Sequence, residues 1–441
     1  MSRPGHDPSQ LRASGGWLEG DPVGNRQFAE LGWLRTESGE ELPIRLAFET
    51  FGELNAQRSN AVLVLHALTG DSHVAGQAGP GHPNGPWWPQ LVGPGQAIDT
   101  DRYFVVAANI LGGCQGSTGP SSLAPDGRPW GSRFPQLTPR DQVAAEMRLA
   151  DHLGISRFHL VIGASMGGHR ALEWALMSPD RVENLVVIAS GARTTADQIS
   201  WAYPQLAALE LDPAFKDGDY YDAPPGQGPY RGLGIARAIA HATYRTADEL
   251  NARFGRVPQK TEEPLTGGRF AVQSYLEYHA TKLAVRFDAG SYRTLTHAMI
   301  RHDVGRRRGG YVRALQQIAA RTLVVAVDSD RLFPPAESHL IASHVPDAQL
   351  MMLSSPCGHD GFLVESEELA AALREFLATA PQLEPAPLLE PVDFASDAAA
   401  PPASGGPAPD GGEESSTARL TELFARRRTS NARGGWYDTR R

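Results

Sequence analysis

Continuous runs of apolar residues mark the strands of a buried sheet. The runs cover residues 61–66, 103–109, 158–162, 184–189, 322–327 and 349–353. A strand covered on both faces is apolar along its whole length, as in parallel sheets flanked by helices. Residues 28–54 instead place apolar side chains at strand-like spacing on either side of a polar stretch, 37–40. This pattern predicts antiparallel edge strands joined there.

Helical patterns alternate with these runs. Thr138 is a suitable N-cap, Pro139 fits the first helical position and Asp141 favours the first turn, so a helix should begin here. Another helix should follow the strand at 158–162, and the last, Ser366 to Ala378, has Ser366 as its expected N-cap. Alternating strands and helices predict an α/β fold with a doubly wound, mostly parallel sheet.

Between residues 191 and 319 the alternation stops. Helical patterns dominate, at 234–241, 272–283 and 292–299, and we expect a helical lid inserted over the carboxyl edge of the sheet. The predicted organisation is an arm (1–25), a catalytic core (26–190 and 320–379), the lid (191–319) and a tail (380–441).

The tail is rich in Pro, Ala, Gly, Ser and acidic residues, a composition typical of disorder. Its residues 420–428 form a short basic amphipathic pattern, which is either a solvated end or a segment that binds a partner.

Composition excludes several classes of protein. The net charge of −9 argues against nucleic-acid binding. No apolar stretch is long enough for a membrane span, and the N-terminal residues do not resemble a signal peptide. Two cysteines do not make a disulfide framework and fit a reducing cytoplasm. We therefore expect a cytoplasmic protein without membrane contact.

The sequence Gly163-Ala-Ser165-Met-Gly167 lies between a predicted strand and a predicted helix. A G-x-S-x-G turn in that context is typical of a nucleophile elbow, in which a tight turn presents the serine at the N-terminus of a helix. The alternative is an ordinary glycine-rich turn. Because a serine hydroxyl is a weak nucleophile, the functional interpretation requires a base and an acid elsewhere in the chain.

In the α/β-hydrolase arrangement the acid follows a late strand and the histidine precedes the last helix. His359 lies in that last loop, and both Asp328 and Asp330 follow the strand at 322–327. Topology alone leaves the choice between these two acids open. The oxyanion hole should use the backbone N–H of Met166 and one from the loop after the early strand, assigned to Leu68.

Several stretches together resemble the homoserine O-acetyltransferase family, over about residues 25–378. They are His66–His73, Trp87-Trp88, Leu91–Gly95, Asn109–Cys114, Gly116–Ser121, Gly163–Gly168, Ala171–Trp174, Phe287–Tyr292, Ser329–Pro335, Gly358–Asp360 and Phe362–Glu365. The resemblance implies an α/β-hydrolase fold with a lid and assigns Asp330 as the acid of the triad.

The family's chemistry implies a ping-pong transfer of acetyl from acetyl-CoA, a co-substrate, through Ser165 to L-homoserine, in methionine biosynthesis. His359 would be the base. Arg237 would bind the acceptor carboxylate, which suits a guanidinium, and Asp360 would bind its amino group. Tyr244 lies two helical turns beyond Arg237 and would share its face. The resemblance further implies a homodimer through the lid helices, with no metal and no bound cofactor.

Alternative functions remain open at this level. Related O-succinyltransferases usually carry an Arg two residues after the acid; here that residue is Leu332, which favours acetyl, although Arg331 is adjacent. The acceptor is homoserine or serine. A serine esterase or other hydrolase would use the same triad, and a non-catalytic scaffold would not need it. The arginine-rich run 305–310 is either a solvated loop or a contact for CoA phosphates.

Overall fold

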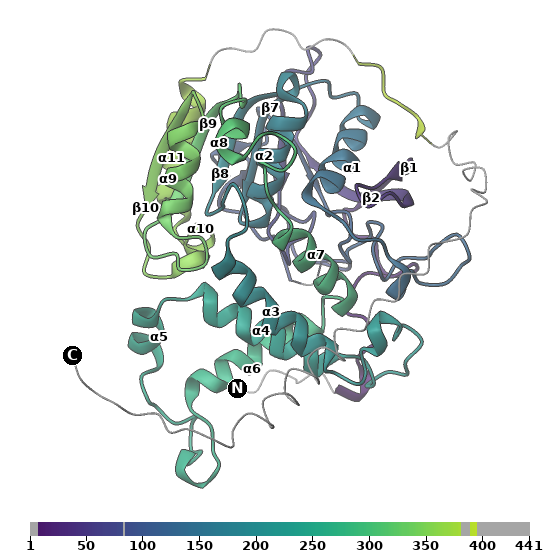
Figure 1. Cartoon of the computed structure of the whole chain (residues 1–441), viewed down its shortest axis with the longest axis vertical. Coiled ribbons are helices and arrows are strands. Elements are labelled where there is room, and N and C mark those ends of the chain that lie inside the picture. The colour runs from purple at the N-terminus through teal and green to yellow at the C-terminus, as the bar shows by residue number, and fades with distance from the viewer. Residues whose placement is uncertain (1–7, 83, 381–388, 395–441) are drawn as a thin grey trace, which may run out of the picture. The chain divides into compact units, whose positions relative to one another are not determined.

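An eight-stranded sheet forms the centre of the molecule (Figure 1). The computed structural model describes residues 8–82, 84–380 and 389–394. The strands of the sheet are β1 (Gln27–Arg35), β2 (Glu41–Phe51), β3 (Ala61–Leu65), β6 (Phe104–Ala108), β7 (Phe158–Ala164), β8 (Val182–Ile188), β9 (Arg321–Val327) and β10 (Ala348–Leu353). Two short strands, β4 (Val92–Gly93) and β5 (Ile98–Asp99), pair separately.

The strand order is β1-β2-β6-β3-β7-β8-β9-β10. Only the first two pairings, β1 with β2 and β2 with β6, are antiparallel; the remaining pairings are parallel. The mostly parallel sheet predicted from the apolar runs is therefore confirmed, including its antiparallel edge.

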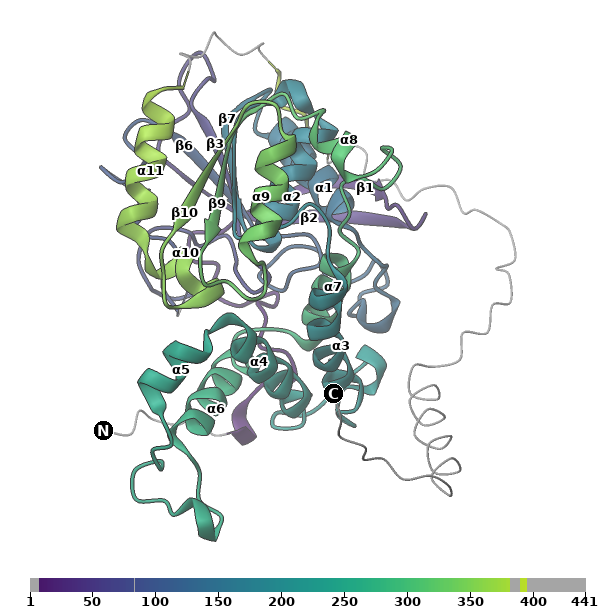
Figure 2. The ribbon, with the colours of Figure 1, turned by 60° about the vertical axis from the view of Figure 1, so that its left-hand side comes forward.

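Helices cover both faces of the sheet (Figure 2). One face packs against α1 (Pro139–His152), α2 (Met166–Met177) and α9 (Pro335–His344). The other face packs against α11 (Ser366–Ala378) through apolar side chains that include Leu373 and Phe376. Burial on both sides explains why the central strands are apolar throughout.

Capping was predicted correctly for one helix and wrongly for another. Thr138 caps α1 in a capping box with Asp141, as expected. For α11 the N-cap is Glu365, not Ser366. Only Glu365 separates α11 from the short helix α10 (Gly361–Val364), so Ser366 already belongs to the helix and its side chain makes no cap.

The segment between β8 and β9 is helical, and its described residues form no strand of the sheet. Its helices are α3 (Ala196–Glu210), α4 (Tyr230–Tyr244), α5 (Ala247–Phe254), α6 (Ala271–Ala284), α7 (Ala289–Ile300) and α8 (Tyr311–Leu315). In both views α4 lies beside α3 and α6, beyond one edge of the sheet. None of the described helices is long and apolar enough to cross a membrane.

The described part of the N-terminal arm, from residue 8, packs against the rest of the protein. Ala13 and Ser14 are buried, and Trp17 N–H donates to Cys114 O over 2.8 Å. Tyr230 Oη, from α4, donates to Leu11 O over 2.6 Å. The basic amphipathic pattern at 420–428 lies outside the described residues.

Candidate active site

Ser165 occupies the turn between β7 and α2 with φ 55° and ψ −123°, a backbone conformation that residues with side chains rarely adopt. The turn is tight enough to require both neighbouring glycines. A Cβ on Gly163 would lie 2.1 Å from Gly167 O, and one on Gly167 would lie 2.1 Å from Leu65 O. The strained turn places the serine at the N-terminus of α2, as a nucleophile elbow does.

The structure brings Ser165, His359 and Asp330 together. Ser165 Oγ donates to His359 Nε2 over 2.9 Å, and His359 Nδ1 donates to Asp330 Oδ2 over 2.6 Å. His359 lies in a single helical turn (Gly358–Asp360) after β10, and Asp330 follows β9. This is the hydrogen-bond chain of a Ser-His-Asp triad.

Geometry also distinguishes the two candidate acids. The second oxygen of Asp330 accepts the N–H groups of Leu332 (2.8 Å) and Phe333 (2.9 Å), which fixes the carboxylate. Asp328 instead accepts Ser355 N–H over 3.0 Å, so it braces the loop that carries the histidine. Topology could not separate these roles because both acids follow the same strand.

All three triad side chains are buried. Burial disfavours the imidazolium of His359, but the charge of Asp330 and its hydrogen bond outweigh that effect, so the pKa of His359 is raised. The buried carboxylate therefore makes the imidazole a stronger base.

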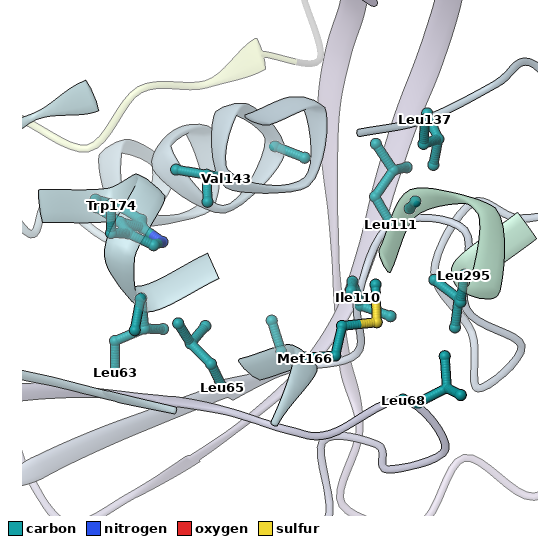
Figure 3. Close-up of a cluster of buried hydrophobic side chains, with 14 of the residues drawn as sticks. Leu63, Leu65, Leu68, Ile110, Leu111, Leu137, Val143, Met166, Trp174 and Leu295 are labelled. Atoms are coloured by element: carbon teal, nitrogen blue, oxygen red, sulfur yellow. The ribbon is translucent and has the colours of Figure 1, made fainter. Parts of the chain in front are cut away.

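Met166 and Leu68, the predicted oxyanion-hole residues, belong to one buried cluster at the elbow. Figure 3 shows the Met166 side chain among Ile110, Leu68 and Leu295 in the core, while its backbone begins α2. Within the described part of the chain, neither the Met166 N–H nor the Leu68 N–H has a hydrogen-bond acceptor. Both donors are therefore available for an oxyanion.

A buried polar network holds the Leu68 loop against α2. Arg170, in α2, donates to His66 O over 2.6 Å and forms an ion pair with Glu146 of α1. Ile110 N–H donates to His66 Nε2 over 3.1 Å. Burial, together with the charge of Arg170, lowers the pKa of His66 to about 3, so this ring is neutral and accepts that bond.

Arg237 and Tyr244 share one face of α4, as their spacing predicted. The Arg237 guanidinium lies 5.5 Å from the centre of the Tyr244 ring, which is 5.6 Å from the His359 ring. Arg237 is half-buried and forms no ion pair with any described carboxylate. Beside the triad there is thus a cation without a counter-ion, as a carboxylate ligand requires.

Asp360 lies next to His359 but already has a partner that the sequence did not indicate. Arg245 Nε lies 3.1 Å from Asp360 Oδ2. Burial raises the pKa of Asp360, and the charges of Arg245, His359 and Arg237 oppose that rise. The only sequence signal for Arg245 was its position directly after Tyr244 at the end of the lid helix.

Aromatic rings surround the base, and sequence reasoning did not assign them a role. Phe333 stacks on His359 with ring centres 5.4 Å apart, and Phe362 meets it edge-on at 5.6 Å. Both belong to the stretches Ser329–Pro335 and Phe362–Glu365, which carry the family resemblance and were the available signal. They shield the imidazole from water.

His169, one turn after Ser165 in α2, is fully buried and stacks on His302 at 3.9 Å. Burial is the main reason that its pKa is lowered well below the ordinary value. Phe333 separates it from the triad, with its ring 5.6 Å from His169. It is a packing residue beneath the site.

One group of described side chains has the composition of a metal site: Glu49, His73 and His82, all buried. Their ligand atoms already have protein partners. His73 Nδ1 pairs with Glu49 Oε2 over 2.9 Å, Ser72 Oγ donates to Glu49 Oε1 over 2.8 Å, and Asn25 N–H donates to His82 Nε2 over 3.1 Å. These atoms satisfy one another, so the group is a buried polar network.

Two arginines of the run 305–310 form ion pairs with acidic residues outside the lid. Arg306 forms an ion pair with Glu37 over 2.5 Å, and Arg308 pairs with Glu173 of α2 over 2.8 Å. Of the three arginines in the run, only Arg307 is exposed. The pairing of its neighbours favours a structural role for the run, not contact with CoA phosphates.

Two residues after Asp330, where related O-succinyltransferases usually carry an Arg, this chain has an apolar and largely buried residue. Leu332 is 9% exposed. The guanidinium of Arg331 lies 5.3 Å from the centre of the Trp201 ring of α3 and so stacks on the lid.

Comparison with known proteins agrees with this geometry. The family model of the alpha/beta hydrolase fold matches residues 60–366. The homoserine O-acetyltransferase of Thermobifida fusca is 58% identical over 85% of this chain and 99% of that protein. The homoserine O-acetyltransferase of Mycobacterium avium is 52% identical over 80% of this chain and 90% of that protein.

Solved structures of two kinds share the fold. A homoserine O-acetyltransferase from Bacillus anthracis matches with TM-score 0.74 at 25% identity, covering 80% of this chain and 98% of that one. Esterase E22 matches with TM-score 0.73 at 28% identity, covering 80% and 99%. The chain belongs to the homoserine O-acetyltransferase family, within the alpha/beta hydrolase fold.

Proposed function

We propose that this protein transfers an acetyl group from acetyl-CoA to the side-chain hydroxyl of L-homoserine, a step of methionine biosynthesis. The observation that carries the proposal is the buried hydrogen-bond chain from Ser165 through His359 to Asp330, below a lid that presents an unpaired Arg237. The 51–58% identical relatives carry the same activity in their names.

In the first half-reaction, His359 Nε2 takes the proton of Ser165 as Oγ attacks the thioester carbonyl. The N–H groups of Leu68 and Met166 stabilise the tetrahedral oxyanion. The carbon–sulfur bond then breaks, the proton on His359 passes to the sulfur, and CoA leaves as a thiol. An acetyl ester remains on Ser165.

In the second half-reaction, His359 takes the proton of the homoserine hydroxyl, which attacks the acetyl ester. The proton returns to Ser165 Oγ when the ester bond breaks. The same two N–H groups stabilise the second oxyanion, and Asp330 keeps the imidazole oriented throughout. No group other than the two substrates and the protein is required.

The acceptor is recognised by its charged ends. Arg237 binds the homoserine carboxylate, and Tyr244 shares the same face of α4. Asp360 binds the ammonium group and keeps Arg245 as its second partner at 3.1 Å. Because Asp360 follows His359 directly, a bound ammonium holds the acceptor hydroxyl beside the base.

Leu332 supports acetyl over succinyl as the transferred group. A buried leucine cannot pair with the free carboxylate of a succinyl group, and burying an unpaired charge is costly. The neighbouring Arg331 is held on Trp201. We therefore propose acetyl-CoA as the donor.

An esterase is the second candidate, because solved esterases such as E22 share this fold. Its triad would be the same, with water as the second nucleophile. Arg237 and the Asp360–Arg245 pair favour the transferase, since an esterase for simple esters has no use for an amino-acid site beside its base.

The test follows free thiol from acetyl-CoA with and without homoserine, together with the appearance of O-acetylhomoserine. We expect thiol release to depend on homoserine and to match product one to one, and Ser165→Ala to abolish both. Serine in place of homoserine should react poorly. Thiol release at the same rate without an acceptor would establish the hydrolase instead.

A parallel assay replaces acetyl-CoA with succinyl-CoA. The account predicts slow transfer by the parent protein and faster transfer by Leu332→Arg. Equal rates with both donors in the unmodified protein would contradict acetyl specificity.

We also propose that the protein is a homodimer through its lid. Tyr203 of α3 and Ile235 of α4 are 56% and 55% exposed, and these two helices pack against each other. Large apolar side chains exposed on two neighbouring helices favour an interface there. Analytical ultracentrifugation should give the mass of a dimer for the parent protein and of a monomer for Ile235→Glu. A monomer mass for the parent protein would refute the interface.

We also propose a cytoplasmic location. Both cysteines are free, as is usual in a reducing compartment.

A further inference from the structure

A large cavity, here called the arm cavity, lies between the N-terminal arm, the loop after the oxyanion turn and α6. Its volume is about 870 Å³, within the range of ligand sites. Its lining includes Trp17 of the arm, Asp71 of the loop, Tyr278 and Lys282 of α6, and Arg286 beyond α6. Figures 1 and 2 both show the purple arm next to α6.

The arm cavity has an excess of positive charge. Arg26, Lys282 and Arg286 line it, and none of them forms an ion pair with a described carboxylate. A further pair in the lining, Arg12 with Asp21 at 2.8 Å, neutralises itself. Asp71 is the remaining carboxylate of the lining. The balance favours an anionic ligand.

Arg26 shows most clearly that the cationic wall is built into the fold. It is 5% exposed, and its guanidinium donates to Gly81 O (2.9 Å) and Gln115 Oε1 (2.9 Å), whereas its buried Nε has no partner among the described residues. These acceptors, and Val23 O at 3.2 Å, are neutral, and the carboxylates of Asp71 and Glu49 act on Arg26 only at longer range. An anion in the cavity would therefore stabilise the buried guanidinium.

One residue of the lining, Arg286, is hydrogen-bonded to the loop that carries Leu68. Arg286 Nη1 donates to Thr69 O over 2.9 Å, and Thr69 directly follows Leu68. A thioester whose carbonyl meets the Leu68 N–H must extend away from the buried serine. Because Arg286 contacts this loop and also lines the arm cavity, the cavity is a candidate for the part of the thioester that extends from Leu68.

Aromatic side chains complete the lining. Tyr278, on α6, is 48% exposed, and Trp17 lines the cavity from the arm. Exposed aromatic faces beside cations are suited to a nucleobase carrying phosphates. An amino-acid acceptor is too small to need a cavity of this size.

We propose that the arm cavity binds the phosphate-bearing nucleotide end of the acyl donor. The inference rests on the proposed function, because it requires a CoA thioester as the donor. The phosphates lie against Lys282, Arg26 and Arg286, and the base lies against Tyr278 or Trp17. The N-terminal arm is then part of the donor site.

The test uses two donors that share the reacting group. Acetyl-CoA carries the nucleotide, and S-acetyl-N-acetylcysteamine lacks it. Lys282→Glu and Thr281→Glu place negative charge at exposed positions of the lining. Each should raise KM for acetyl-CoA about tenfold, with kcat little changed. Neither should alter kcat/KM for the short thioester.

The matched control is Lys260→Glu, the same charge change at an exposed lid residue outside the arm cavity. It should leave KM for acetyl-CoA unchanged. An unchanged KM in Lys282→Glu and Thr281→Glu, or an equal rise in all three variants, would overturn the assignment. If the parent protein does not use acetyl-CoA at all, the proposed function fails instead, so the two failures are distinguishable.

Discussion

At the scale of single residues, Ser165 illustrates how strain is maintained at a reactive group. Its left-handed backbone costs about 1–3 kcal/mol. Ser165 N–H donates to Ile188 O over 2.9 Å, and Ser190 Oγ donates to Ser165 O over 2.9 Å. These bonds and the two close-packed glycines fix the turn. The serine hydroxyl is therefore preorganised beside the imidazole.

The raised pKa of His359 sets the acid limb of the pH–rate profile. The protonated ring cannot accept the serine proton, so kcat/KM should fall as pH decreases through that pKa and level off above it. Asp330→Asn removes the charge that raises this pKa and leaves burial, which lowers it. The acid limb should therefore move to lower pH.

The same variant should lower kcat by about 10⁴-fold, because the imidazole loses its orienting partner. Initial rates between pH 5 and 9 measure both effects. An acid limb that stays in place in Asp330→Asn would show that another group controls the profile.

Arg237 should matter for the acceptor and little for the donor. Arg237→Gln removes a two-point hydrogen bond to a carboxylate, and KM for homoserine should rise about a hundredfold. Arg231→Gln, an exposed arginine on the same helix, is the control. Steady-state kinetics with homoserine as the varied substrate checks this, and equal effects of the two variants would rule out the assignment.

Residue roles were predictable where chain order constrains them. Ser165 and His359 follow from their places in the α/β pattern. The position after β9 could not decide whether Asp328 or Asp330 is the acid of the triad, because only their hydrogen bonds distinguish them. The pairing of Arg245 with Asp360 joins the lid to the core and has no local sequence signature.

At the scale of elements, α1 begins at a capping box whose threonine has a second role. Thr138 Oγ1 also donates to Glu37 over 2.6 Å. Thr138→Ala should lower the free energy of unfolding by about 1 kcal/mol and leave activity intact. Urea unfolding measures the change, with Ser343→Ala of α9, an exposed position, as the control. Equal free energies of unfolding for the parent and Thr138→Ala would show that the cap does not contribute to stability.

The pairing of α1 with α2 depends on a buried ion pair. Arg170→Met leaves Glu146 buried without its partner and should cost about 3–5 kcal/mol. Adding Glu146→Leu should restore most of that loss, because the unpaired charge is then removed. Thermal unfolding of the parent, the single variant and the double variant provides the comparison. An Arg170→Met protein as stable as the parent would contradict this view of the network.

The central strands, β3 and β6 to β9, were predictable to within a residue or two because burial on both faces makes them apolar throughout. Three lid helices, α3, α5 and α8, were not predicted, for physical reasons. Helix α8 has five residues, too few for a periodic pattern. Pro204 lies inside α3 and interrupts its helical pattern, and α5 buries none of its residues. Amphipathic periodicity requires a buried face, which α5 lacks.

At the scale of the whole molecule, the site is assembled between the core and the lid. Gly358, with φ 66°, lies so close to α4 that a Cβ there would approach Tyr244 O to 2.6 Å. Thr246 Oγ1 donates to Pro356 O over 2.8 Å. The histidine loop and the end of α4 are therefore packed together, and the lid's Arg237 and Tyr244 keep a fixed position relative to His359. Apolar patterning predicted a lid but not this docking.

The central claim is that Ser165 holds the acetyl group until homoserine takes it. The most direct measurement is the intact mass and peptide map of protein quenched in acid after mixing with acetyl-CoA alone, then after adding homoserine. The account predicts one acetyl group per chain on the peptide containing Ser165, lost on addition of homoserine as O-acetylhomoserine forms. Product formation without any acetylated Ser165, under conditions where the ester is stable, would contradict it.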